Sequence, residues 1–355
     1  MRYLLTLCAA LLLAVPAAAQ QTEFARLVAR LSEGPGFFDS DNLVSNETSY
    51  LHVVGDLRRA GVRGGAYLGV GPEQNFSYIA AIQPDIAILV DIRRENMLLH
   101  LLFKAMFESA ATRAEYLGLL YGRPAPDNPG SWRARDLMTL LDYIIVTPFD
   151  SARHRRNHDA LMERVQGYGV PLSEQDVATL RRFHDEFALA GLQLTFSSRG
   201  RIARRNYPTA YRLYMETDLD SSRVSYLAAE DRWLAVRRLH QTNKIVPVVG
   251  DLAGAAAMPA IAQYLRETNR RISAFYVSNV EMYLFRNGVF PSFVRNVRAL
   301  PAGPNSVLIR SWFARFDMEP GLLPGHFSAQ QMQPFSEFLR RTEQPDSVQY
   351  WQLRE

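Results

Sequence analysis

The sequence predicts an α/β fold built on an open, mainly parallel β-sheet. Two short and continuously apolar runs, Gly64–Val70 and Ile86–Val90, flank a helical pattern over Pro72–Ile82. Parallel strands with both faces covered are apolar throughout, and two of them joined by a helix make a β-α-β unit. Two further apolar runs, Ile245–Val249 and Ile272–Val277, repeat this pattern later in the chain.

The segments around the first two strands are helical or turn-rich. Thr22–Leu31 has the pattern of a short amphipathic helix. Asn46–Arg59 also has helical spacing, and Asn46 or Thr48 could cap it. From Asn96 to about Asn243 the pattern is mainly helical. The helices expected there are Met97–Phe107, Ala134–Leu141, Ser173–Leu189 and Ala228–His240.

A helix over Ala256–Arg266 should join the third and fourth strands, and Val307–Phe313 should form another strand. The simplest organisation is one Rossmann-like domain made from residues 20–95 and 244–355. A large, mainly helical insertion at 96–243 follows the second strand of that domain.

The first residues have the pattern of a secretory signal. Arg2 precedes the apolar run Tyr3–Val15, and an A-x-A site ends at Ala19. The run is shorter than the roughly 20 apolar residues that span a bilayer, although a retained anchor is the alternative. We therefore expect cleavage near Ala19 and a periplasmic or secreted protein. Cys8 is the only cysteine, so the mature chain would have no disulfide and no thiolate chemistry.

Composition narrows the class of partner. Lys and Arg number 40 and Asp and Glu 36, a net charge of +4 spread along the chain. This is not the clustered basic surface of a nucleic-acid-binding protein. No segment after the leader has the pattern of a membrane span. A small-molecule ligand is the expected partner, with neither nucleic acid nor stable membrane insertion. The oligomeric state is left open.

The strongest motif is GVGPEQN, which directly follows the first strand and opens the next helix. Its glycines, Gly69 and Gly71, let the backbone turn sharply near a ligand, and the helix start offers free N–H groups. Asp91 ends the second strand, 20 positions after Gly71. An acid at that distance accepts hydrogen bonds from ribose hydroxyls in nucleotide-binding folds. We therefore assign Gly69, Gly71, Glu73, Asn75 and Asp91 to a candidate cofactor site.

The alternative is a glycine-rich turn followed by a solvent-facing acid. The third glycine of the dinucleotide fingerprint is missing, because Gln74 lies where it would fall and is followed by Asn75 and Phe76. That absence argues against NAD or FAD, whose binding turn uses this glycine to pack the helix closely on the strand.

The run GAYLGVGPEQNFSYIAAIQPDIAILVDIRREN resembles the first motif and second strand of class I S-adenosylmethionine-dependent methyltransferases. The resemblance implies that the glycine turn lies under the amino-acid part of the cofactor and that Asp91 binds the ribose. VVGDL at Val248–Leu252 is similar to the third-strand motif, which implies that Asp251 lies near the adenine. SNVEMYLF at Ser278–Phe285 occupies the place of the fourth-strand motif.

The segment FDSDNLVSNE before the first strand also resembles a poorly characterised family of bacterial methyltransferase-like proteins. No NPPY-type catalytic tetrad occurs, so Asn279 and Glu281 are the candidate catalytic residues. Glu281 is either a general base or the partner of an arginine from the insertion. The polar segment Asp39–Tyr50 is either a lid over the cofactor or a loop with a helix cap.

No metal site is expected. His154 and His158 have i, i+4 spacing, but they lie among arginines and suggest a solvated basic helix instead of a zinc site. The clusters Arg153–Arg156 and Arg201–Arg205 are more typical of surface charge than of a phosphate or lipid site. Hydrolase, metalloprotease and P-loop motifs are absent from the sequence.

Two functions remain. The motif order favours an S-adenosylmethionine-dependent methyltransferase-like protein that acts on or binds a small molecule. The predicted export favours an exported, non-catalytic ligand-binding or scaffold protein on the same fold, because S-adenosylmethionine is made in the cytoplasm. The sequence identifies no substrate.

Overall fold

The computed structural model describes residues 22–198, 207–313 and 322–354. The expected leader at 1–19 and the cluster Arg201–Arg205 lie outside these ranges. No helix within them is long and apolar enough to cross a bilayer.

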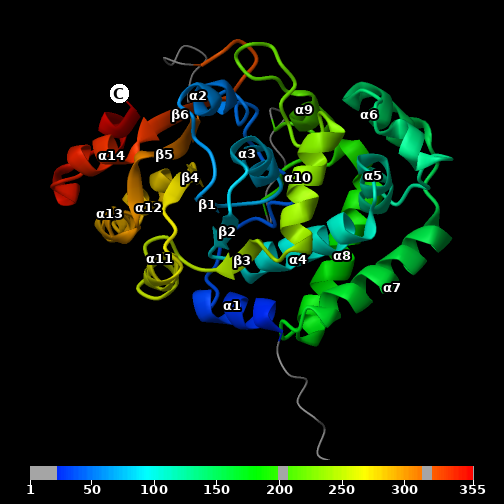
Figure 1. Ribbon diagram of the computed structural model, residues 1–355, viewed down its shortest axis with the longest axis horizontal. Helices are drawn as coiled ribbons and strands as arrows, with labels where there is room; N and C mark the ends of the chain where they lie inside the picture. The colour runs from blue at the N-terminus through cyan, green and yellow to red at the C-terminus, as the bar shows by residue number, and fades with distance from the viewer. Residues whose placement is uncertain (1–21, 199–206, 314–321, 355) are drawn as a thin grey trace, which may run out of the picture.

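Six strands form a single mixed sheet in the order β3-β2-β1-β4-β5-β6 (Figure 1). Neighbouring strands are parallel except for β6, which runs antiparallel to β5. The prediction of an α/β fold with a mostly parallel sheet is therefore confirmed. The strands are β1 (Ala66–Gly69), β2 (Ile86–Asp91), β3 (Ile245–Val249), β4 (Ile272–Ser278), β5 (Ala302–Phe313) and β6 (Ser328–Pro334).

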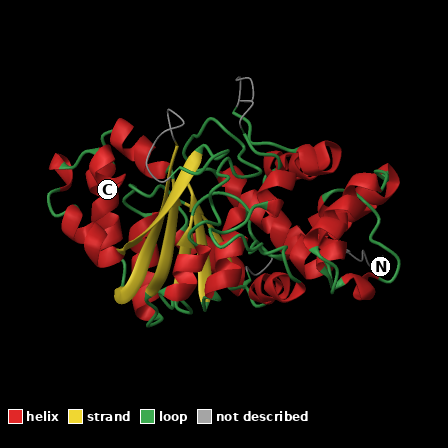
Figure 2. Ribbon diagram, turned by 90° about the horizontal axis from the view of Figure 1, so that it is seen from above, coloured by secondary structure: helices red, strands yellow, loops and turns green. Residues whose placement is uncertain are grey.

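Helices cover both faces of the sheet (Figure 2). On one side α10 packs on both α3 and α4, and on the other side α11 packs on α1 and α13. The α-helices are α1 (Glu23–Leu31), α2 (Val54–Arg59), α3 (Gln74–Ile82), α4 (Arg94–Ser109), α5 (Arg113–Leu120), α6 (Leu137–Val146), α7 (Ser151–Gly167), α8 (Glu174–Ala190), α9 (Ala210–Met215), α10 (Glu230–Gln241), α11 (Ala257–Glu267), α12 (Val280–Arg286), α13 (Phe290–Ala299) and α14 (Phe335–Arg341).

Most expected elements form with small shifts at their ends. Helix α1 begins after Thr22, whose hydroxyl accepts a hydrogen bond from the Ala25 N–H at 3.0 Å. The helix expected over Asn46–Arg59 is wrong in its first part, because only Val54–Arg59 is α-helical. Strand β6 was not expected, since its sequence SAQQMQP lacks an apolar run.

The sheet brings together the ends of strands that are distant in sequence. Helices α4 to α10 lie between β2 and β3 along the chain, yet β3 pairs with β2 so that Asp91 is opposite Val249. The order reverses between β1 and β4, which are neighbours in the sheet. In open α/β sheets, ligands bind beyond the carboxyl ends of the strands at such a reversal.

Candidate functional site

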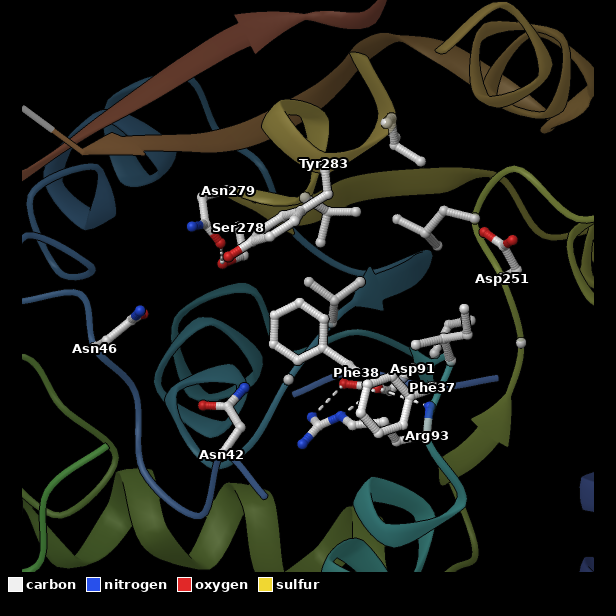
Figure 3. A pocket seen from close by; sticks show the side chains of 18 of the residues that line it. Phe37, Phe38, Asn42, Asn46, Asp91, Arg93, Asp251, Ser278, Asn279 and Tyr283 are labelled. Carbon is white, nitrogen blue, oxygen red and sulfur yellow. Dashed lines mark hydrogen bonds and ion pairs between the residues drawn. The ribbon is translucent and has the colours of Figure 1, made fainter. Parts of the chain in front are cut away.

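A cavity of about 210 Å³ lies at the carboxyl ends of β1 to β4 (Figure 3). Four of the expected site residues line it, one from the end of each strand or the loop after it: Gly71, Asp91, Asp251 and Asn279. The convergence expected from the sequence is therefore present for these four. Aromatic rings supply much of the remaining wall, from Phe37, Phe38, Phe196 and Tyr283.

Gly69 and Asn75 do not line the cavity but fix the turn beside it. The Asn75 side-chain amide donates hydrogen bonds to the carbonyls of Val70 and Pro72 at 2.9 and 2.8 Å. A Cβ on Gly69 would lie 1.9 Å from the Asn75 Oδ1 atom. Gly71 has a φ of +80°, which favours glycine. Asn75 thus holds the turn, one position after Gln74, where a dinucleotide fold has its third glycine.

Glu73 also lies outside this cavity. Its carboxylate is buried and accepts hydrogen bonds from the hydroxyls of Tyr214 at 2.9 Å and Tyr226 at 2.9 Å. Burial raises the pKa of Glu73 to about 7, although the two tyrosine hydroxyls act in the opposite direction. Glu73 lines a second, much smaller cavity, which shares Ser45 and Gln74 with the first.

Asp91 lines the cavity, but its carboxylate already has a partner. Arg93 donates from Nε to Oδ1 at 2.9 Å and from Nη2 to Oδ2 at 2.7 Å. The sequence analysis expected Asp91 either to bind a ribose or to face solvent. The solvent-facing alternative is wrong, because the Asp91 side chain is only 11% exposed, and a ribose would have to share Asp91 with Arg93.

Asp251 is held by Glu33, two residues after the end of α1. Its backbone N–H donates to the Glu33 carboxylate at 2.7 Å, and the Glu33 N–H donates to the Val249 carbonyl at 2.9 Å. The Asp251 side chain accepts a hydrogen bond from the Ala253 N–H at 2.9 Å. In Figure 3, Asp251 and Asn279 lie on opposite sides of the cavity.

Glu281 points away from the cavity, whereas Asn279 lines it. Arg310 donates to the Glu281 Oε2 atom at 2.7 Å, and both side chains are buried. Arg310 belongs to β5, so the partner of Glu281 is not an arginine from the helical segment. A role for Glu281 as general base in this cavity does not fit that position.

The polar segment before β1 forms part of the cavity wall, and it does not cap α2, whose N-cap residue is Val53. Asn42, Ser45 and Asn46 are among the lining residues. Arg93 fixes the segment by donating from Nη1 to the carbonyls of Ser40 and Asp41, at 2.7 Å each.

Sequence reasoning missed three contributors to the site: Arg93, Gln74 and the aromatic wall. Gln74 lies between two residues that were selected and Arg93 lies two residues after Asp91, which is the signal that could have found them. The aromatic residues have no such signal, because an isolated ring is more often part of a core.

The two histidines of α7 are not solvated. His154 and His158 are buried, while Arg153, Arg155 and Arg156 are exposed on the same helix. His158 Nδ1 lies 3.2 Å from His184 Nδ1, and burial lowers the pKa of both rings. The expected basic face exists, but the histidine face belongs to the α7–α8 contact. No metal-holding group is found in the described ranges.

A family model described as a domain of unknown function (DUF7790) matches residues 43–124 and 186–354. The match covers more than half of the chain, so the chain belongs to this family. It includes all six strands, and the unmatched residues 125–185 lie among the helices between β2 and β3. A search of curated proteins found no match.

Proposed function

We propose that this chain binds S-adenosylmethionine, or a closely related nucleoside, as a methyltransferase-like protein that acts on or binds a small molecule. The observation that carries the proposal is that Gly71, Asp91, Asp251 and Asn279 line one cavity. Each follows, or ends, one of the strands to which the sequence resemblance assigned a cofactor motif. Within this proposal the fold is Rossmann-like, and residues 96–243 are an insertion after its second strand.

The turn after β1 favours this cofactor over a dinucleotide. The third glycine of the dinucleotide fingerprint lets the helix pack closely on the strand. Here Gln74 is at that position, and Asn75 next to it uses its side chain to hold the turn. A ligand without a pyrophosphate does not need the complete fingerprint.

A second candidate function is binding without catalysis, in an exported protein. The observation that favours it is the ion pair between Glu281 and Arg310, which removes the candidate base from the cavity. In this alternative the cavity still holds the nucleoside, and Asn279 contacts it without taking part in a reaction.

Calorimetry on the chain beginning at Gln20 tests the proposal. We expect S-adenosylmethionine and S-adenosylhomocysteine to bind in the micromolar range, and NAD to bind much more weakly. No heat with either sulfur nucleoside at millimolar concentration would overturn the proposal. If both bind, the methyl donor can be incubated with candidate small-molecule acceptors, and its consumption separates the two functions.

A further inference from the structure

Glu47 is a buried carboxylate surrounded by neutral donors. Its Oε2 atom accepts hydrogen bonds from Tyr276 at 2.8 Å, Ser311 at 2.6 Å and Gln330 at 2.8 Å. Ser278 donates to the other oxygen, Oε1. No ion pair reaches Glu47 from the Lys, Arg and His side chains of the described ranges. A buried carboxylate normally has a cationic partner, and none of the described side chains supplies one to Glu47.

Two contacts connect this charge to the cavity. Ser278 lines the cavity and ends β4 with a φ of +54°, which is uncommon for a residue other than glycine. Because its hydroxyl hydrogen is directed to Glu47, the lone pairs of its oxygen remain for a ligand. Gln74, also in the wall, donates to the Tyr276 hydroxyl at 3.3 Å, and that hydroxyl donates to Glu47.

The other charged residues that line the cavity do not cancel the negative charge of Glu47 near Ser278. Asp91 and Arg93 neutralise each other. Asp251 is a further negative group, and it lies across the cavity from Ser278 (Figure 3). The wall at Ser278 and Asn279 is therefore electronegative.

We propose that Glu47, acting through Ser278, makes the cavity select a ligand with a positively charged centre over a neutral ligand of the same shape. The inference rests on the proposed function and specifies it, because S-adenosylmethionine carries a sulfonium where S-adenosylhomocysteine has a neutral thioether. A sulfonium has no N–H to donate, so selection has to come from charge and from acceptor oxygens.

The test compares the dissociation constants of these two nucleosides by calorimetry at pH 7.5. We expect the wild-type chain to bind S-adenosylmethionine roughly 30- to 100-fold more tightly, the size of effect that a unit charge exerts about 6–8 Å away at an effective dielectric constant of about 20. Glu47→Gln should bring the ratio close to one. Glu337→Gln removes a half-exposed carboxylate of α14 that does not line the cavity, and it should leave the ratio unchanged.

A pH series on the wild-type chain gives the same test if Glu47→Gln does not fold. Burial raises the pKa of Glu47, so acidification neutralises it and the ratio should fall towards one. The ionisable groups nearest to it are Tyr276 and Tyr78, whose pKa values burial raises, and both stay neutral throughout. His326 contacts the adjacent Thr48, and burial lowers its pKa. The amino and carboxyl groups of the two nucleosides are alike and largely cancel in the ratio.

The outcomes separate the two proposals. If neither nucleoside binds, the proposed function fails. If both bind equally at pH 7.5, or if a folded Glu47→Gln variant keeps the wild-type ratio, the proposed function stands and charge selection by Glu47 is overturned. A ratio that stays constant as the pH falls also overturns it.

Discussion

Asp91 and Arg93 form a two-point ion pair in which each carboxylate oxygen accepts one N–H of the guanidinium. The Arg93 side chain is only 4% exposed and that of Asp91 11%. The same guanidinium holds the carbonyls of Ser40 and Asp41. One ion pair therefore joins the tip of β2 to the polar segment that forms part of the cavity wall.

Replacing Asp91 should destabilise the protein as well as weaken nucleoside binding. Asp91→Ala leaves Arg93 as a buried, unpaired cation, which typically costs about 3–5 kcal/mol. As a control, Asp220→Ala removes an exposed partner of Arg59 and should cost less than about 1 kcal/mol. Urea denaturation of both variants measures the difference. From the sequence alone, a strand-tip carboxylate would be expected to contribute little, and an unchanged unfolding midpoint for Asp91→Ala would support that simpler expectation.

Glu281 should affect stability and not ligand affinity. Glu281→Gln removes the charge that faces the buried Arg310, and we expect a loss of about 1.5–3 kcal/mol. Glu337→Gln alters a half-exposed partner of Arg341 and should change stability by less than about 0.5 kcal/mol. Denaturation and calorimetry on the same samples give both quantities. A large fall in nucleoside affinity with unchanged stability would return Glu281 to the site.

The turn after β1 should not tolerate a methyl group at Gly69. A Cβ there would overlap the Asn75 Oδ1 atom, and overpacking of this kind costs about 1–3 kcal/mol. Gly34→Ala is the matched control, because nothing lies within 4 Å of the Cβ it would add. Thermal unfolding compares them. Equal midpoints would mean that Asn75 can move aside and does not hold the turn.

Glu73 should make stability depend on pH in a defined window. Its pKa is raised from 4.5 to about 7 by burial, so the folded state binds its proton more tightly than the unfolded state does. The stabilisation is complete below pH 4.5, is lost as the pH rises to about 7, and is absent above that. Its full size is on the order of 3 kcal/mol.

Urea midpoints at pH 5, 6, 7 and 8 for wild type and Glu73→Gln measure this contribution as a difference. Taking the difference cancels the opposite effect of His100, whose pKa burial lowers to about 4. A difference that does not change between pH 5 and pH 8 would mean that Glu73 keeps one protonation state throughout.

Export predicts a processed amino terminus. The basic Arg2, the apolar run Tyr3–Val15 and the site ending at Ala19 lead us to expect a mature chain that begins near Gln20. Mass spectrometry of protein from its native source gives the answer directly. An intact Met1 would contradict cleavage near Ala19 and would leave a retained anchor or a chain that is not exported.

Continuous apolar runs made the first four strands predictable. Ile245–Val249 is buried at every position, and its bounds match those read from the sequence. β6 escaped prediction because its polar residues are paired inside the fold: Gln333 accepts from Arg310, and Gln330 donates to Glu47. Such pairs join segments far apart in sequence, and no local pattern reveals them.

The candidate site was also predictable only in part. Strand ends predicted which backbone segments meet, and Gly71, Asp91, Asp251 and Asn279 do line one cavity. Spacing could not show which side chains would turn inward to satisfy buried partners. Glu73 and Glu281 both do so, the first towards tyrosines and the second towards Arg310.

The pairing of β2 with β3 across α4 to α10 has a consequence for the order of folding. Strand β2 ends at Asp91 and its sheet neighbour β3 begins at Ile245, with 153 residues between them along the chain. Closing a flexible loop about five times longer than a usual crossover costs only about 1.4 kcal/mol more. The long separation therefore affects the rate of folding more than the stability, because strands far apart in sequence pair slowly. We expect the intervening helices to collapse first through their local contacts and so shorten the search that lets β3 join the sheet.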